Sequence, residues 1–239
     1  MMKSTLERFR PSVKIGCTSV TDERSKRPYR LKKRAEAMSD TRQRITEAAM
    51  ELHGTLGPAR TTVSAVAEWA GVQRHTVYRH FPTEDDLFAA CSAHWNELNP
   101  LPDMEAWRRE TEPAVRLETA LNELYEYYAA TASMWANVLR DVDLVPSLPS
   151  TLAPFERHLD DVADLLASGR GARGARRALL KAAIRHAIDF RTWESLVQRG
   201  GITASQGARL MRALVEETVR PPQPVRGPTT AEPTEPRLR

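Results

Sequence analysis

The sequence predicts an all-α fold, with a small three-helix domain near the N-terminus followed by a larger helical domain. Two observations lead to this prediction. Apolar side chains recur every three to four residues in successive segments between about residues 45 and 219, which is the spacing of amphipathic helices. No alternating strand pattern and no internal repeat interrupts them, and Gly and Pro residues fall between the segments.

Composition divides the chain of 239 residues into four parts. We expect a disordered basic arm at 1–38, a small helical domain at 39–90, a larger helical domain at 91–220 and a disordered Pro-rich tail at 221–239. The net charge of +4 and the pI of about 9.3 make the chain mildly basic. Two cysteines, no apolar run long enough for a membrane and no apolar signal core favour a cytoplasmic location.

The N-terminal head carries seven basic and no acidic residues between Arg24 and Arg34. Like charges at this density favour disorder, so we expect an arm that binds phosphates or the minor groove. A solvated tail without a role and translation starting at Met38 are the alternatives. The first helix is expected to begin at Ser39 or Asp40, since both are good N-caps. An apolar face then follows at helical spacing, formed by Ile45, Ala48, Ala49 and Leu52.

Residues 61–81, TTVSAVAEWAGVQRHTVYRHF, read as two short helices joined by a tight turn. Thr61 or Thr62 caps the first helix, and Gly71 closes it in the left-handed conformation. The second helix begins with polar residues, while Val77 and Phe81 face the core. This division suits a helix-turn-helix, in which one helix packs and the next offers its N-terminal residues to base edges.

The run AGV followed by TVYRHF, after TTV, resembles the DNA-binding domain of the TetR family of bacterial transcriptional regulators, most closely over 41–90. The resemblance implies that 39–90 is a helix-turn-helix DNA-binding domain and that 91–220 is a helical effector-binding and dimerisation domain. It also implies that Arg74 and His75, which follow Gln73, read bases. The backbone-gripping positions it implies are Thr62, Thr76, Tyr78 and His80. One departure is that Thr83 and Glu84 stand where the family usually has a Lys that contacts phosphate.

The body is expected to contain six further helices. Thr83 caps a helix reaching Leu98, Pro113 begins one ending near residue 130, and a separate one follows over 134–141. Helices over about 150–168, 175–199 and, after the Thr203 cap, about 204–219 complete the fold. The GRGARG run at 169–174 is interpreted as a basic loop, because no strand precedes it as a dinucleotide-binding motif requires.

The aromatic residues of the body suggest a pocket for a small, mostly apolar effector. Arg140 or His186 is the candidate polar anchor. Ordinary core packing is the alternative for each residue. The predicted ligand-binding residues are Tyr125, Tyr128, Trp135, Phe155, His186 and Phe190.

Other classes of function fit the sequence less well. No catalytic triad, metal quartet or phosphate loop can be assembled, so we expect neither an enzyme nor a bound metal or cofactor. His53 and Cys91 are expected to pack in the core. A basic architectural protein that binds DNA without sequence preference would lack the base-reading helix. The sequence therefore predicts a homodimeric repressor that binds a near-palindromic double-stranded DNA operator and is released by its effector.

Overall fold

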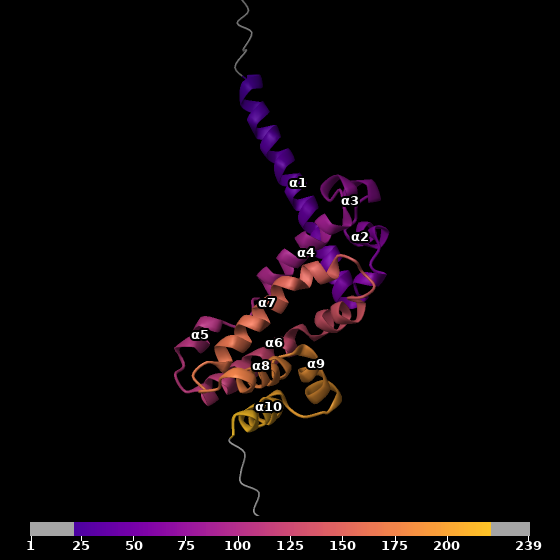
Figure 1. The fold of residues 1–239 in the computed structure, drawn as a ribbon. Coiled ribbons are helices and arrows are strands. Elements are labelled where there is room, and N and C mark those ends of the chain that lie inside the picture. The colour runs from indigo at the N-terminus through magenta and orange to yellow at the C-terminus, as the bar shows by residue number, and fades with distance from the viewer. Residues whose placement is uncertain (1–21, 221–239) are drawn as a thin grey trace, which may run out of the picture. The chain divides into compact units, whose positions relative to one another are not determined.

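A computed structural model describes residues 22–220, and within this range every regular element is helical (Figure 1). The predicted all-α fold is thereby confirmed. The N-terminal elements are α1 (Asp22–Thr55), the 3-10 helix η1 (Pro58–Arg60), α2 (Val63–Trp69), α3 (Arg74–His80) and α4 (Glu84–Leu98). The remaining elements are α5 (Met104–Arg109), α6 (Pro113–Asp141), α7 (Leu148–Ala167), α8 (Gly174–Ala187), α9 (Phe190–Trp193), the π-helix η2 (Glu194–Arg199) and α10 (Ala204–Val219). No helix within 22–220 is long and apolar enough to cross a membrane.

Helix α1 begins earlier than the sequence analysis expected. It starts at Asp22, so neither Ser39 nor Asp40 caps it, and residues 22–38, which were expected to form a disordered arm, belong to this helix. Thr41 sits inside the helix, where its hydroxyl donates to the carbonyl of Ala37 at 2.8 Å. Lys, Arg, Ala and Glu all have high helix propensity, and this outweighs the repulsion among the basic side chains. Residues 1–21, and the tail at 221–239, lie outside the described residues.

The chain separates into two compact units, which meet between Arg44 and Ile45 within α1. The described part of the first unit is a single helical segment whose side chains from residue 29 onward are almost all exposed. The described part of the second unit runs from Ile45 to Arg220 and holds two apolar cores.

The first core belongs to α1–α4. The predicted stripe of α1 is buried, and it packs with the apolar residues of the next three helices. This core consists of Ile45, Ala48, Ala49, Leu52, Val66, Ala67, Ala70, Val77, Phe81, Leu87 and Cys91. Thr83 caps α4 as predicted, because its hydroxyl accepts from the Asp86 amide while the Asp86 carboxylate accepts from the Thr83 amide.

The second core lies among α5–α10, with α10 packed along α6 and α8, and α7 packed along α8 (Figure 1). Helix α6 is continuous, whereas two helices had been predicted over this stretch. No Gly or Pro interrupts residues 130–134. Thr131 is buried there, and its hydroxyl donates to the carbonyl of Tyr127 at 2.6 Å. The helix therefore runs through the expected break.

The single helix predicted over 175–199 is instead divided into α8, α9 and η2. The break falls at Asp189, whose carboxylate caps α9 by accepting from the Arg191 amide at 2.8 Å. The hydroxyls of Tyr125 and Tyr128 donate to the carbonyls of Ala187 and Ile188 at 2.9 and 2.7 Å. Two buried phenols thus satisfy the backbone acceptors that a continuous helix would have paired.

Two further predictions for the C-terminal half are confirmed. The GRGARG run lies in the connection between α7 and α8 and extends only to the first residue of α8. Thr203 caps α10 in a reciprocal arrangement with Gln206. On α10, Ala208, Met211 and Val215 are buried, while Leu214 from the same predicted apolar set is half exposed.

Candidate DNA-binding surface and ligand cavity

The turn between α2 and α3 has the geometry expected of a helix-turn-helix. The hydroxyl of Thr62 accepts from the Ala65 amide at 3.1 Å and so caps α2. Gly71 has φ of 64°, a value that a residue with a side chain adopts only with strain. The Val72 amide then donates to the Ala67 carbonyl at 2.9 Å, which closes the helix and directs the chain into α3.

Helix α3 places its polar residues outward. Val77 is buried, whereas Gln73, Arg74 and His75 at the start of the helix are exposed. Base edges in the major groove require donors and acceptors that project from the N-terminal turn of a recognition helix. These three side chains meet that requirement, so the structure presents the predicted base-reading residues at an accessible surface.

The side chain of Arg74 contacts Tyr78, which is another predicted DNA-binding residue. Its guanidinium donates to the Tyr78 hydroxyl at 3.3 Å and lies 5.7 Å from the centre of the Tyr78 ring. This hydrogen bond raises the pKa of the fully exposed Arg74 above its ordinary value. Tyr78 is 39% exposed, and Thr76 and His80 are half-buried. Their roles in gripping the DNA backbone stay a prediction.

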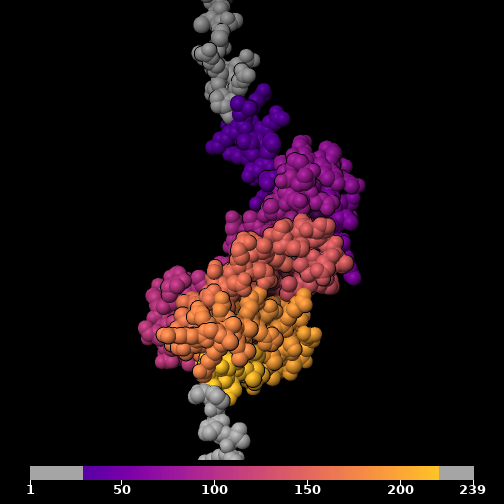
Figure 2. Space-filling view, viewed as in Figure 1, coloured from indigo at the N-terminus to yellow at the C-terminus, as the bar shows by residue number. Residues whose placement is uncertain are grey.

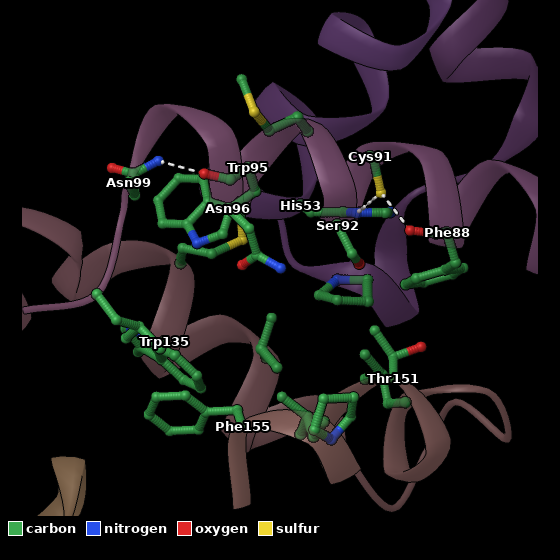
Figure 3. Close-up of a pocket in the computed structure, with 18 of the residues that line it drawn as sticks. His53, Phe88, Cys91, Ser92, Trp95, Asn96, Asn99, Trp135, Thr151 and Phe155 are labelled. Carbon is green, nitrogen blue, oxygen red and sulfur yellow. Dashed lines mark hydrogen bonds between the residues drawn. The ribbon is translucent and has the colours of Figure 1, made fainter. Parts of the chain in front are cut away.

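A cavity of about 370 Å³ lies elsewhere in the second unit, between α4, α6, α7 and the C-terminal end of α1 (Figure 3). Helix α4 contributes one continuous face to it, since the lining residues recur at spacings of three and four. These residues are Phe88, Cys91, Ser92, Trp95 and Asn96, followed by Asn99 at the end of the helix. Figure 3 shows Trp95 and Asn96 on the wall opposite Trp135 and Phe155.

The cavity wall includes a buried histidine and cysteine that contact each other. The His53 ring stacks on Phe88, with ring centres 4.7 Å apart, and its Nδ1 lies 3.6 Å from the Cys91 sulfur. The thiol also donates to the Phe88 carbonyl at 3.2 Å. Burial lowers the pKa of His53 to about 4 and raises the pKa of Cys91 to about 12, so both groups are neutral near pH 7. Both pack in the interior as expected.

The six predicted ligand-binding residues divide into two groups. Trp135 and Phe155 line the cavity, with ring centres 4.2 Å apart. Tyr125 and Tyr128 are fully buried core residues whose hydroxyls donate to the carbonyls of Ala187 and Ile188, and His186 is exposed, so the structure does not bring these three to the cavity. They lie outside the cavity because that part of α6 faces α8 and α9. The last member, Phe190, lines a neighbouring cleft that shares Trp135 and Phe155 with the cavity.

Sequence reasoning missed the face of α4. Its residues combine two aromatic rings, a thiol, a hydroxyl and two amides at helical spacing, from Phe88 to Asn99. A purely structural helix would place apolar side chains at most of these positions. Mixed polarity along one face of this helix is therefore the signal in the sequence from which the cavity wall could have been predicted.

The last two turns of α6 line the cavity and also bind the backbone at the end of α1 and in the connection between α1 and α2. Asn137 donates to the carbonyls of His53 and Gly54 at 3.2 and 2.7 Å. Arg140 donates to the Leu56 carbonyl at 2.9 Å, and Asp141 accepts from the Ala59 amide at 3.0 Å. We call Asn137, Arg140 and Asp141 the α6 clamp.

Within the α6 clamp, Arg140 and Asp141 form an ion pair at 2.8 Å. The hydrogen bond from Arg140 lowers the pKa of Asp141, whose carboxylate is almost fully buried. Gly57 has φ of 94°, and a Cβ at this position would overlap the Arg140 guanidinium. Arg140, predicted as an effector anchor, therefore holds the backbone that links α1 to α2.

Comparison with known proteins identifies the N-terminal domain. Residues 45–91 match the sequence profile of the bacterial regulatory proteins of the tetR family. The chain is 29% identical over 129 residues to the HTH-type transcriptional regulator AcrR of Shigella flexneri, covering 54% of this chain and 49% of that protein. It is 37% identical over 76 residues to an uncharacterized HTH-type transcriptional regulator, TtgW of Pseudomonas putida, covering 30% of this chain and 57% of that protein. The chain thus spans about half the length of the curated relatives it matches.

Among solved structures, the chain is similar to the TetR family transcriptional regulator PfmR from Thermus thermophilus. The TM-score is 0.52 at 19% identity, with 76% of this chain and 96% of that chain covered. At this identity the likeness shows a shared fold.

Proposed function

We propose that this chain, which carries the DNA-binding domain and the fold of the TetR family, is a sequence-specific DNA-binding transcriptional regulator, acting as a repressor that a small molecule releases from its operator. The observation that carries the proposal is the outward face of α3, where Gln73, Arg74 and His75 are exposed on a helix fixed by a buried core. Since the proposed target is chromosomal DNA, we expect the protein to act in the cytoplasm.

Arg74 is the residue that we assign to base reading. A guanidinium donates two hydrogen bonds to the O6 and N7 atoms of a guanine, and this pairing distinguishes guanine from the other bases. Arg74→Ala should weaken operator binding by ~1–3 kcal/mol and relax the preference at one base position. Tyr78→Phe removes the hydroxyl that we assign to a phosphate contact and that also accepts from Arg74 at 3.3 Å, but it keeps the ring beside the guanidinium. Binding should therefore weaken without a change in preference.

The matched control for this experiment is Arg79→Ala. Arg79 is a second exposed arginine on the same helix, one turn beyond the predicted base-reading residues. It carries the same charge, so its loss changes nonspecific attraction alone. Selecting bound fragments from genomic DNA supplies the operator, and titrating the three variants against that operator and a scrambled duplex tests the assignment. If the wild-type protein binds both duplexes equally, the chain is instead an architectural protein.

A homodimer gives the selectivity that one short helix lacks. Leu179 on α8 and Leu210 and Leu214 on α10 are exposed, although α8 and α10 pack against each other. Figure 2 shows these C-terminal helices, in orange and yellow, at the surface. Exposed leucines on neighbouring helices suit a two-fold helical interface. Two recognition helices then read a near-palindromic operator, with half-sites about one helical turn or a multiple apart.

The cavity supplies the proposed response to a ligand. Its lining includes α4, which three residues separate from α3, and α6, whose final turns bind the end of α1 and the connection between α1 and α2. A ligand shifts the protein away from the DNA-binding form if it binds more tightly to a form in which these helices are displaced. The difference between its affinities for the two forms determines the size of the shift. A compound that occupies the cavity without weakening operator binding would refute this part of the proposal.

A further inference from the structure

The lining of the cavity carries no formal charge. Within residues 22–220, no Asp, Glu, Lys or Arg is among the lining residues. The two histidines of the wall, His53 and His158, are both neutral at pH 7, since burial lowers the pKa of each. An ionic ligand would lose its hydration there without gaining a counter-charge, and such a transfer is strongly unfavourable.

Two residues of the wall carry a buried side-chain nitrogen without a hydrogen-bond partner in the described part of the chain, Trp135 at Nε1 and His158 at Nε2. Trp135 is only 8% exposed, and its indole N–H has no hydrogen-bond partner in the described part of the chain. The Tyr127 hydroxyl lies near this N–H without completing a hydrogen bond. An indole N–H donates and cannot accept. Because an unpaired buried donor is costly, an acceptor brought by a ligand at this point would gain a full hydrogen bond.

The remaining walls favour a flat ring system. Trp135 and Phe155 form a tilted aromatic pair on one side, and Trp95 stands on the opposite side (Figure 3). Phe88 and its stacked partner His53 bound the cavity at another point. Planar aromatic molecules make offset or edge contacts with such surfaces, which add to the free energy of burying their area.

Resting on the proposed ligand response, we infer that the cavity takes an uncharged, planar aromatic molecule with a carbonyl-type oxygen, which accepts a hydrogen bond from the Trp135 indole N–H. The ring system fills the space between Trp95 and the Trp135–Phe155 pair. The oxygen determines the orientation of the ligand, and the absence of charged wall residues determines its neutrality.

Four probes of one shape test each element of this inference. They are 2-acetylnaphthalene, 2-ethylnaphthalene, 2-naphthoate and 2-naphthylmethylammonium, and their affinities for the full chain are measured by titration calorimetry at pH 7 without DNA. The acetyl compound should bind about tenfold more tightly than the ethyl compound, because it alone pairs the buried donor. Both charged probes should bind more weakly than the acetyl compound.

Trp135→Phe removes the indole N–H and keeps an aromatic ring, so it should abolish the preference for the acetyl over the ethyl compound. Trp193→Phe is the matched control. The Trp193 indole N–H is also buried without a partner within 22–220, but it does not line the cavity, so this variant should keep the preference. Circular dichroism and thermal melting of both variants verify their folding.

Three results would overturn the inference. Equal affinity of the acetyl and ethyl compounds, or a preference that survives Trp135→Phe, would remove the role of the indole donor. Tightest binding of either charged probe would contradict the neutral class. Absence of saturable binding by all four would exclude an aromatic occupant.

Operator binding without any probe is measured separately, and it tests the proposed function independently. If the operator is bound while these results go against the inference, the inference alone fails. Loss of specific operator binding with the probe preferences intact would instead refute the proposed function.

Discussion

His53 should make the protein lose stability as the pH falls from about 6.5 to 4. The folded protein holds the imidazole neutral because its pKa is lowered to about 4, whereas the unfolded chain protonates it near 6.5. Above pH 6.5 both states carry a neutral ring, so His53 has no effect on stability there. Between the two values only the unfolded state gains the proton, so the free energy of unfolding declines with falling pH.

The size of this effect follows from the two pKa values. At ~1.36 kcal/mol per pKa unit, a decrease from 6.5 to about 4 removes ~3 kcal/mol once the pH is below 4. For a chain of this length that loss corresponds to a fall in melting temperature of roughly 6–12 °C. The neighbouring titratable group is Cys91, which stays a neutral thiol because its pKa is about 12. Histidine therefore accounts for the local proton uptake.

The matched variant is His53→Phe, which keeps a ring stacked on Phe88 and removes the titration. Urea unfolding of both proteins is followed between pH 7.5 and 4, and the difference between their unfolding free energies is compared across the series. The difference should change by ~3 kcal/mol in favour of the variant as the pH falls. A difference that stays constant with pH would show that His53 titrates normally in the folded state.

Three further predictions follow from the fold. Gly57→Ala should cost more stability than Gly171→Ala, because both glycines have positive φ but only Gly57 lacks space for a Cβ. The backbone conformation alone accounts for ~1–2 kcal/mol in each variant. Equal losses of unfolding free energy in urea would contradict the close approach of Arg140 to Gly57. Leu214→Glu should yield monomers and abolish operator binding, whereas the control Leu144→Glu, at a leucine that is also exposed but lies outside α10, should stay dimeric. If light scattering shows that Leu214→Glu is still a dimer, the interface lies elsewhere. Removal of the residues before Met38 should reduce the slope of log affinity against log salt concentration by roughly 0.9 for each phosphate that the arm neutralises in the full chain. Identical slopes for the full and the shortened chain would mean that the arm does not bind DNA.

The sequence predicted those features that depend on local chemistry. The caps at Thr62, Thr83 and Thr203 were recognisable because each stands just before an apolar helical pattern. The buried stripe of α1 followed from spacing alone. The helix-turn-helix was predictable for the same reason, since its turn is closed by Gly71 within a few residues.

Features that depend on distant partners were not predictable. The break before α9 requires the Tyr125 and Tyr128 hydroxyls, which come from residues about 60 positions earlier. The cavity is likewise formed by segments far apart in the chain, so aromatic composition identified Trp135 and Phe155 but also two core tyrosines. The early start of α1 was missed because the density of like charges was weighted above helix propensity.

The last turns of α6 present two different faces, and this separates two kinds of mutational effect. Trp135 and Val138 line the cavity, while Asn137 and Arg140 of the clamp hold the connection between α1 and α2. Under the proposed response to a ligand, substitutions on the first face should alter which molecules the cavity binds. Substitutions on the second face should alter how strongly ligand binding changes the positions of α1 and α2 in the predicted DNA-binding domain. A directed-evolution campaign can therefore vary the two faces in turn, and obtain sensors that differ in ligand at constant response or in response at constant ligand.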